Sequence, residues 1–159
     1  MKTPQKTNAA RILDRAGIGY ELREYDFDEN DLSAQHVASV LGVNPKQVFK
    51  TLVLKGDRTG YFVTVIPSEK EVNLKVAAAV SGNKSCDLIP MKDLLSVTGY
   101  IRGGCSPIGL KKPFPVFFDS SVENFDRIFI SAGQRGKQFF ISPGPLLNFT
   151  HAVLASLTV

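Results

Sequence analysis

The sequence predicts an α+β domain in which short helices pack around a mixed β-sheet that is partly closed into a barrel. Two observations favour this fold class. Helical segments and β-branched or aromatic runs are intermixed, without the regular strand–helix alternation of a doubly wound sheet. The C-terminal third also carries three β-branched or aromatic runs separated by Gly, Asn and Ser, which is typical of strands joined by turns.

The N-terminal segment is predicted to form a helix that begins at Pro4 and ends at Gly17, because its apolar residues recur on one helical face. The next segment, residues 18–25, alternates loosely and is predicted to be an edge strand. Ser33 is a favourable N-cap residue, and the apolar positions that follow it predict a second helix ending at Gly42.

The middle of the chain carries a β-hairpin signal. Residues 51–55 and 61–66 are two strand-like runs that flank the turn sequence Gly-Asp-Arg-Thr-Gly. The C-terminal third supplies three further strands, predicted at residues 116–119, 127–131 and 138–142. A last helix is predicted to start near Pro145.

Between the hairpin and the C-terminal third, two short helices and one strand are predicted. Asn73 can cap a helix over residues 74–80. Residues 86–89 form a short strand candidate. Pro90 then opens a helix over residues 91–97, since proline is favoured in the first turn of a helix.

Composition and charge limit the function classes. The 159 residues are 43% hydrophobic and 21% charged, which is enough for one packed domain over residues 1–159. We expect a cytoplasmic protein with no membrane contact, because there is no long apolar run, no signal-peptide core and no disulfide framework. The net charge of +4 permits a polyanionic partner and does not require one.

Lys50 is the first candidate functional residue. It stands at the start of a predicted strand, on the opposite face from Phe49 and Thr51. A surface lysine that extends its ammonium group into water would explain this position. A cation directed into a pocket would also explain it, and such a lysine could hold a carbonyl, carboxylate or phosphate group.

Two glycine-rich segments are candidates for binding loops. Residues 96–109 contain four glycines, which permit positive φ angles and a close approach of the backbone to a ligand. Residues 130–138 end a strand in small residues and continue into a basic turn flanked by glycines. A long irregular turn and a tight hairpin are the structural alternatives. Neither segment matches a P-loop or a dinucleotide-binding fingerprint.

The residues supply no obvious nucleophile or metal site. A catalytic Cys105 would need a base, and the two histidines, His36 and His151, lie outside the glycine-rich and strand-end segments. A GxSxG serine elbow is absent, and the scattered cysteines and histidines lack the spacing of metal ligands. We therefore expect a pocket with a lysine and backbone donors, and no cofactor.

Three motifs, in this order and spacing, carry a resemblance to a known family: VFKTLV near residue 50, TGYIRGGCSPIG at 98–109 and FISAGQRGKQ at 129–138. These motifs resemble those of the YbaK/EbsC family of trans-editing aminoacyl-tRNA deacylases, which is related to the prolyl-tRNA synthetase editing domain. The resemblance covers nearly the whole chain. The resemblance implies a curved, barrel-like mixed sheet with short helices around it. It also implies hydrolysis of a mischarged tRNA, most typically Cys-tRNA(Pro).

The resemblance further implies a set of site residues. The lysine and the ester-binding glycine loop of the family correspond to Lys50, Gly103 and Gly104. Its substrate-binding positions correspond to Tyr25, Thr51, Ser106, Pro107, Ser131, Ala132 and Gly133. It implies a mechanism in which the thiol of the substrate cysteine attacks its own ester carbonyl, so that no protein nucleophile is required.

The chain departs from the family pattern at two positions, Gln138 and Pro145, where relatives often carry acidic residues. The role of a carboxylate and the identity of the amino acid removed therefore stay open. The alternatives are a water-dependent deacylase for Ala-tRNA(Pro) or another small amino acid, and a non-catalytic module that binds tRNA or a synthetase. The expected partners are the acceptor end of a mischarged tRNA, contacted through its backbone, and prolyl-tRNA synthetase as a transient partner.

Overall fold

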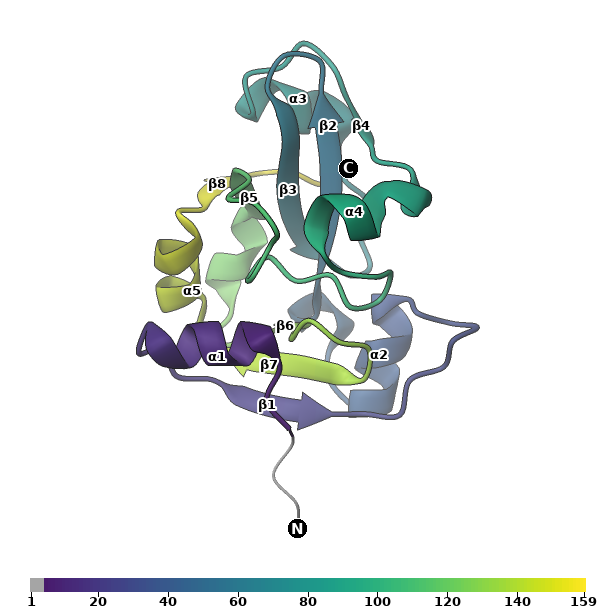
Figure 1. The fold of residues 1–159 in the computed structure, drawn as a ribbon, viewed down its shortest axis with the longest axis vertical. Coiled ribbons are helices and arrows are strands. Elements are labelled where there is room, and N and C mark those ends of the chain that lie inside the picture. Colours follow the sequence, from purple (N-terminus) through teal and green to yellow (C-terminus); the bar gives the residue numbers. More distant parts are fainter. Residues whose placement is uncertain (1–4) are drawn as a thin grey trace.

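The computed structural model describes residues 5–159, and its strands form two sheets, one above the other in the view of Figure 1. One sheet has five strands in the order β4-β2-β3-β5-β8, and the other has three in the order β1-β7-β6. This mixture of short helices and sheets confirms the α+β class. Over the described residues the strands do not close into one barrel-like sheet. The two sheets meet at a parallel bridge between Val48 and Phe129, and a single bridge does not continue a ladder of strand pairing.

The hairpin in the five-stranded sheet confirms the sequence prediction. Strands β2 (Phe49–Gly56) and β3 (Gly60–Pro67) pair antiparallel. The turn between them is held by the buried side chain of Asn83, whose Oδ1 accepts hydrogen bonds from the Arg58 and Thr59 N–H groups at 2.8 and 2.9 Å. Strand β4 (Cys86–Leu88) pairs with the end of β2 nearest this turn.

The rest of the five-stranded sheet is parallel. Strand β5 (Val116–Asp119) pairs parallel with β3, and β8 (Val153–Ala155) pairs parallel with β5. The sequence did not predict β8, which has three residues and is largely exposed at the edge of the sheet. The preceding helix, α5 (Pro143–Thr150), begins two residues before the predicted Pro145.

The three-stranded sheet lies between helices (Figure 1). Strand β1 (Glu21–Glu24) is an edge strand, as predicted, and pairs with the central β7 (Lys137–Ile141), which also pairs with β6 (Ile128–Ser131). Helix α1 (Asn8–Arg15) packs against the face that belongs to the main core, and α2 (Ala34–Leu41) covers the other face around Phe129.

Local capping explains where the helices begin and end. Ser33 Oγ accepts a hydrogen bond from the His36 N–H at the start of α2, and Gly42 ends that helix with a positive φ, as predicted. Asn73 caps α3 (Leu74–Val80), also as predicted. Helix α1 starts at Asn8 with Thr7 as its N-cap, because the Thr7 hydroxyl accepts the Ala10 N–H. The predicted start at Pro4 lies outside the described residues.

The predicted helix over 91–97 is a shorter and mixed element. A 3₁₀ turn, η2 (Met91–Asp93), precedes α4 (Leu94–Thr98), and neither begins with a side-chain cap. Two further 3₁₀ turns are η1 (Pro45–Gln47) and η3 (Ser120–Asn124). Within residues 5–159, none of the helices has the length and apolar character needed to cross a bilayer.

A shared hydrophobic core joins the two sheets. Val53, Val63 and Phe118 come from the five-stranded sheet. Ile130 and Phe139 come from the three-stranded sheet and lie in the same cluster, with α1 packed on them. Burial of this cluster fixes the relative position of the two sheets, and therefore of the strand ends that meet between them.

Candidate functional site

A cavity of about 540 Å³ lies along one edge of β2, between the two sheets. At one end of β2 this strand pairs with β4, through residues 54–56, and at the other end Val48 meets β6. The stretch Phe49 to Val53 lines the cavity between these two contacts. Further walls come from the start of α2, residues 68–71 and the facing ends of β6 and β7. The segment after β4 and the glycine-rich loop complete them with Leu88, Ile89, Met91, Leu94, Arg102, Gly103 and Cys105.

The backbone of Thr51 faces this cavity. The Val53 carbonyl accepts a hydrogen bond from the Ile89 N–H at 3.1 Å, so the polar backbone groups of Val53 point to the edge of β2 that β4 occupies. Backbone groups two residues apart in a strand point to the same edge. The N–H and C=O of Thr51 therefore point to that edge where β4 has ended, and Thr51 is itself a wall residue.

Lys50 is half-buried and lines the same cavity. Burial lowers the pKa of its ammonium group, and the nearby carboxylate of Glu71, another wall residue, acts in the opposite direction. A lysine that only extends into water would not be desolvated in this way. The structure thus favours the interpretation of Lys50 as a cation directed into a pocket.

The glycine-rich loop places one of its two candidate glycines in the cavity. Gly103 is a wall residue with a φ of 84°, and a Cβ there would lie 3.2 Å from Leu32 Cδ2, so glycine is required both by conformation and by close approach. Gly104 is not a wall residue, and its N–H donates to the Ile101 carbonyl at 3.0 Å. Its N–H is therefore not available to a substrate, in contrast to the role that the resemblance implied.

The backbone N–H groups on either side of Gly104 are better placed. Gly103 and Cys105 both line the cavity, and within residues 5–159 their N–H groups donate no hydrogen bond. Ser106 and Pro107 are buried behind this loop and do not line the cavity. The Ser106 hydroxyl accepts a hydrogen bond from the Ile108 N–H at 3.3 Å, which indicates a structural role.

Cys105 contributes a protonated thiol to the cavity wall. Burial raises the pKa of this thiol to about 12, so it is uncharged at neutral pH. Neither histidine lines the cavity. His36 lies on α2 with its Nδ1 3.6 Å from Asp31, and His151 is exposed at the end of α5. The cavity wall therefore contains no histidine that could activate Cys105 as a nucleophile.

The ends of β6 and β7 bring two buried polar side chains into the cavity. Ser131 and Gln138 are directly opposite each other in the strand register, and both are wall residues. Gln138 is 5% exposed, and its Oε1 has no hydrogen-bond partner among the described residues. Gln138 was not among the predicted site residues, although a tight turn between the predicted strands 127–131 and 138–142 would place it opposite Ser131.

The neighbours of Ser131 do not reach the cavity. Ala132 is fully buried in the main core, and its N–H donates to the Lys137 carbonyl at 3.0 Å. Gly133 adopts a φ of 98° and lies against the ring of Tyr100. These two positions shape the turn that carries Ser131 and are not walls of the cavity.

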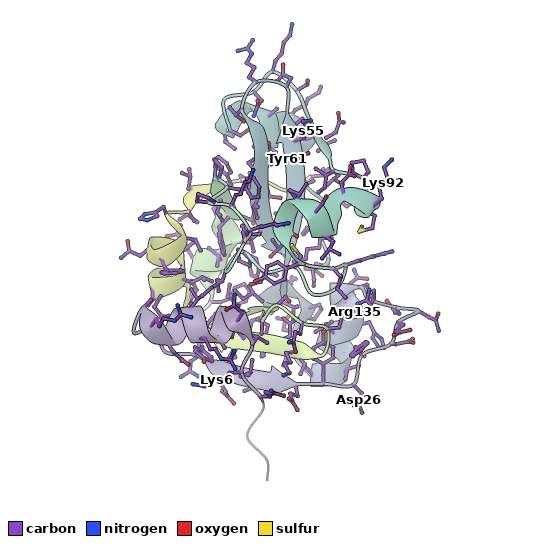
Figure 2. The ribbon with its side chains drawn as sticks, in the orientation of Figure 1. Lys6, Asp26, Lys55, Tyr61, Lys92 and Arg135 are labelled. Atoms are coloured by element: carbon purple, nitrogen blue, oxygen red, sulfur yellow. The ribbon has the colours of Figure 1, made fainter. Side chains whose placement is uncertain are left out.

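Tyr25 lies in a different hollow. It shares that hollow with Phe27, Arg135 and Lys137, and its N–H donates to the Gly136 carbonyl at 2.9 Å. Figure 2 labels Arg135 in the lower half of the molecule. Tyr25 is therefore not a wall residue of the cavity that contains Lys50, and Arg135 joins the two hollows by donating from its Nε to the Arg102 carbonyl at 2.8 Å.

The comparisons with known proteins agree with the motifs. Residues 28–149 match the family model described as the aminoacyl-tRNA editing domain. A relative from Enterococcus faecalis, provisionally named Cys-tRNA(Pro)/Cys-tRNA(Cys) deacylase EbsC, is 44% identical over 157 residues, which cover 99% of this chain and 96% of the relative. The proline–tRNA ligase of Fervidobacterium nodosum is 29% identical over 133 residues. That match covers 84% of this chain and 23% of the ligase, so the chain spans about a quarter of the ligase's length.

Solved structures show the same fold. A crystal structure provisionally described as a trans-editing enzyme for prolyl tRNA synthetase superposes with a TM-score of 0.83 at 22% identity, over 98% of this chain and 99% of the other. The hypothetical protein APE2540 superposes with a TM-score of 0.85 at 23% identity, over 94% of this chain and 97% of the other. With the family match and the full-length relative, these findings confirm that the chain belongs to the aminoacyl-tRNA editing domain family, in its YbaK/EbsC branch.

Proposed function

We propose that the protein is a trans-editing deacylase that cleaves the ester of mischarged Cys-tRNA(Pro). The observation that carries this proposal is the content of the cavity: a desolvated Lys50, free N–H groups at Gly103 and Cys105, and a protonated Cys105 thiol with no histidine on the cavity wall. This set can bind and polarise an ester but offers no protein nucleophile. The provisional name of the 44% identical relative supports the choice of substrate.

In the proposed reaction the nucleophile is the thiol of the substrate cysteine. Its sulfur forms a bond to the ester carbonyl carbon, the bond from that carbon to the ribose oxygen breaks, and the ribose hydroxyl leaves with the proton that the thiol loses. The product is a four-membered cyclic thioester, which water then hydrolyses. Because an aminoacyl ester is already activated, orientation and stabilisation of the oxyanion are sufficient help.

The protein groups have distinct proposed roles. The N–H groups of Gly103 and Cys105 hold the oxyanion, in place of the N–H of Gly104, which is already bonded to Ile101. Lys50 and the Thr51 backbone position the substrate along the edge of β2. Ser131, at the buried end of the cavity, contacts the aminoacyl group.

The remaining predicted substrate-binding positions act indirectly in this proposal. Ser106, Pro107, Ala132 and Gly133 hold the wall residues from behind, because they are packed against the loop and the strand end without reaching the cavity. A transient complex with prolyl-tRNA synthetase is also proposed. It is supported by the similarity to proline–tRNA ligases, which contain a segment of this kind within a longer chain.

A deacylation panel tests the proposal. Cys-, Ser- and Ala-tRNA(Pro) are incubated with the wild type, with Lys50→Ala and with Lys55→Ala, a lysine of the same strand outside the cavity. We expect hydrolysis of Cys-tRNA(Pro) alone, a loss of about 100-fold in Lys50→Ala, and wild-type rates in Lys55→Ala. Equal hydrolysis of the Ser and Ala substrates would show a water-dependent reaction, and tRNA binding without hydrolysis would show a non-catalytic module.

A further inference from the structure

The cavity has two chemically different ends. The buried end is polar and contains Cys105, Ser131 and Gln138, each no more than 9% exposed. The mouth is apolar. It contains Leu88 and Met91, which line the cavity although they are 50% and 57% exposed. Large apolar side chains left in water at the mouth of a cavity are typical of a ligand contact.

The backbone that carries these two side chains is well anchored. Leu88 is paired with Leu54 in the β2–β4 register, and the next residue, Ile89, donates its N–H to the Val53 carbonyl. The turn containing Met91 is closed by a hydrogen bond of 2.9 Å from the Asp93 N–H to the carbonyl of Pro90. Leu88 and Met91 are therefore presented on fixed backbone, which lowers the entropy lost when a ligand binds them.

The cavity wall also carries cations of different exposure. Lys50 is half-buried, whereas Lys70 and Arg102 are exposed wall residues. Two carboxylates, Glu69 and Glu71, offset part of this charge on the same wall. In Figure 2, Lys92, the residue after Met91, points outward from the molecule at the end of the segment that includes α4.

We infer that Leu88 and Met91 form a seat for the terminal base of the aminoacylated RNA, an adenine. This inference rests on the proposed function. In order of increasing exposure, the cavity wall offers polar groups, a half-buried cation and an apolar surface. In the same order the substrate offers its aminoacyl group, its ribose with the adjoining phosphate, and its base. The volume of about 540 Å³ also lies in the range of pockets that enclose a nucleoside-sized ligand.

Adenine suits this seat for a physical reason. A nucleobase presents a flat face that gains from apolar contact, and stacking on a protein side chain contributes about 1–3 kcal/mol per base. The thioether of Met91 is polarizable and adapts to a ring surface. A purine covers more of such a surface than a pyrimidine, so the seat would favour the purine end of the RNA.

The chain permits a direct binding test, because it has two methionines, Met1 and Met91. In protein labelled with ¹³C at the methionine methyl groups, the Met91 signal is assigned as the one lost in Met91→Leu. Adenosine 5′-monophosphate should shift this signal upfield in a saturable manner through the ring current, and uridine 5′-monophosphate should shift it much less. No shift, or equal shifts with both nucleotides, would overturn the inference. This readout does not depend on hydrolysis, so failure of the deacylation panel leaves it intact.

Kinetics supply the second test. Met91→Ala should raise the KM for Cys-tRNA(Pro) about five- to tenfold with kcat retained, and Met91→Leu should restore the wild-type KM. Cysteine methyl ester, which has no base, should be cleaved equally by all variants. Leu95→Ala is the matched control, because Leu95 is 56% exposed and lies outside the cavity. The assignment would be contradicted if Leu95→Ala raised the KM as much as Met91→Ala does, or if Met91→Ala slowed cleavage of the methyl ester equally. It would also be contradicted if the Met91 signal moved on addition of a synthetase and not on addition of nucleotides.

Discussion

The buried thiol of Cys105 makes the stability of the fold sensitive to alkaline pH. Burial raises its pKa from 9.0 to about 12, above the value in the unfolded chain. A group of this kind stabilises the folded state fully below pH 9, and the contribution is lost as the pH rises toward 12, because the unfolded thiol ionises first. A pH of 10.5 is about 1.5 units above the pKa of the thiol in the unfolded chain, whereas the folded thiol is still protonated at this pH. At about 1.36 kcal/mol per unit, the loss at that pH is about 2 kcal/mol.

Urea denaturation of the wild type and Cys105→Ala at pH 7.5 and 10.5 measures this contribution. From pH 7.5 to pH 10.5, the free energy of unfolding of the wild type should fall by about 2 kcal/mol more than that of Cys105→Ala. Other titrating groups are common to both proteins. Tyr100 is the exception, because Cys105 adds to the effect of burial that raises the Tyr100 pKa to about 12, but this phenol stays protonated at pH 10.5. An unchanged difference would refute the reasoning that the thiol is desolvated.

The same variant decides a chemical question. If Cys105 is only a neutral wall residue, Cys105→Ala should still hydrolyse Cys-tRNA(Pro) at a rate within a fewfold of the wild type. Complete loss of hydrolysis in a folded Cys105→Ala protein would identify the protein thiol as the nucleophile. The proposed role of the substrate thiol would then be wrong.

Three other changes have defined outcomes. Gln138→Leu removes a buried oxygen that has no hydrogen-bond partner in the described residues, so the melting temperature should stay equal or rise while turnover falls. A lower melting temperature would show that the amide is hydrogen-bonded in solution. Gly103→Ala places a side chain at a φ of 84° against Leu32. We expect it to lower the free energy of unfolding by about 1–3 kcal/mol and to reduce the deacylation rate. If the loop relaxes around the new side chain, neither the stability nor the rate should change. Asn83→Ala breaks four hydrogen bonds, three to the hairpin turn and one to Ser81, and should lower the free energy of unfolding by about 2–4 kcal/mol in urea denaturation. Its KM should not change, because Asn83 is outside the cavity.

Local signals in the sequence were sufficient for most of the elements. The caps at Ser33 and Asn73 depend on side chains that satisfy backbone groups a few residues away, so neighbouring residues determine them. The hairpin was also predicted locally, from two strand-like runs that flank a glycine-containing turn, although the distant Asn83 holds that turn. The prediction was less accurate where no such signal exists. The segment 91–97 lacks a side-chain cap and divides into a 3₁₀ turn and a short helix.

Long-range packing decided the rest. Strand β8 has three largely exposed residues and no pattern of its own, and it forms because β5 offers an unpaired edge. The single barrel-like sheet was also a matter of tertiary pairing, and the described strands form two sheets instead. Pairing of distant strands depends on the total apolar surface that they bury together, which no local window of sequence contains.

The sequence by itself determined the family, the helix caps, the hairpin and the candidate Lys50, because each is recorded in adjacent residues or in motif order. Only the tertiary structure decided which candidates share a site. Packing of the two sheets on one core brings the edge of β2 to Ser131 and Gln138, more than 75 residues further along the chain, and leaves Tyr25 in another hollow. The physical reason is that a cavity is the space that remains between elements after their apolar faces are buried, and its walls are set by that burial.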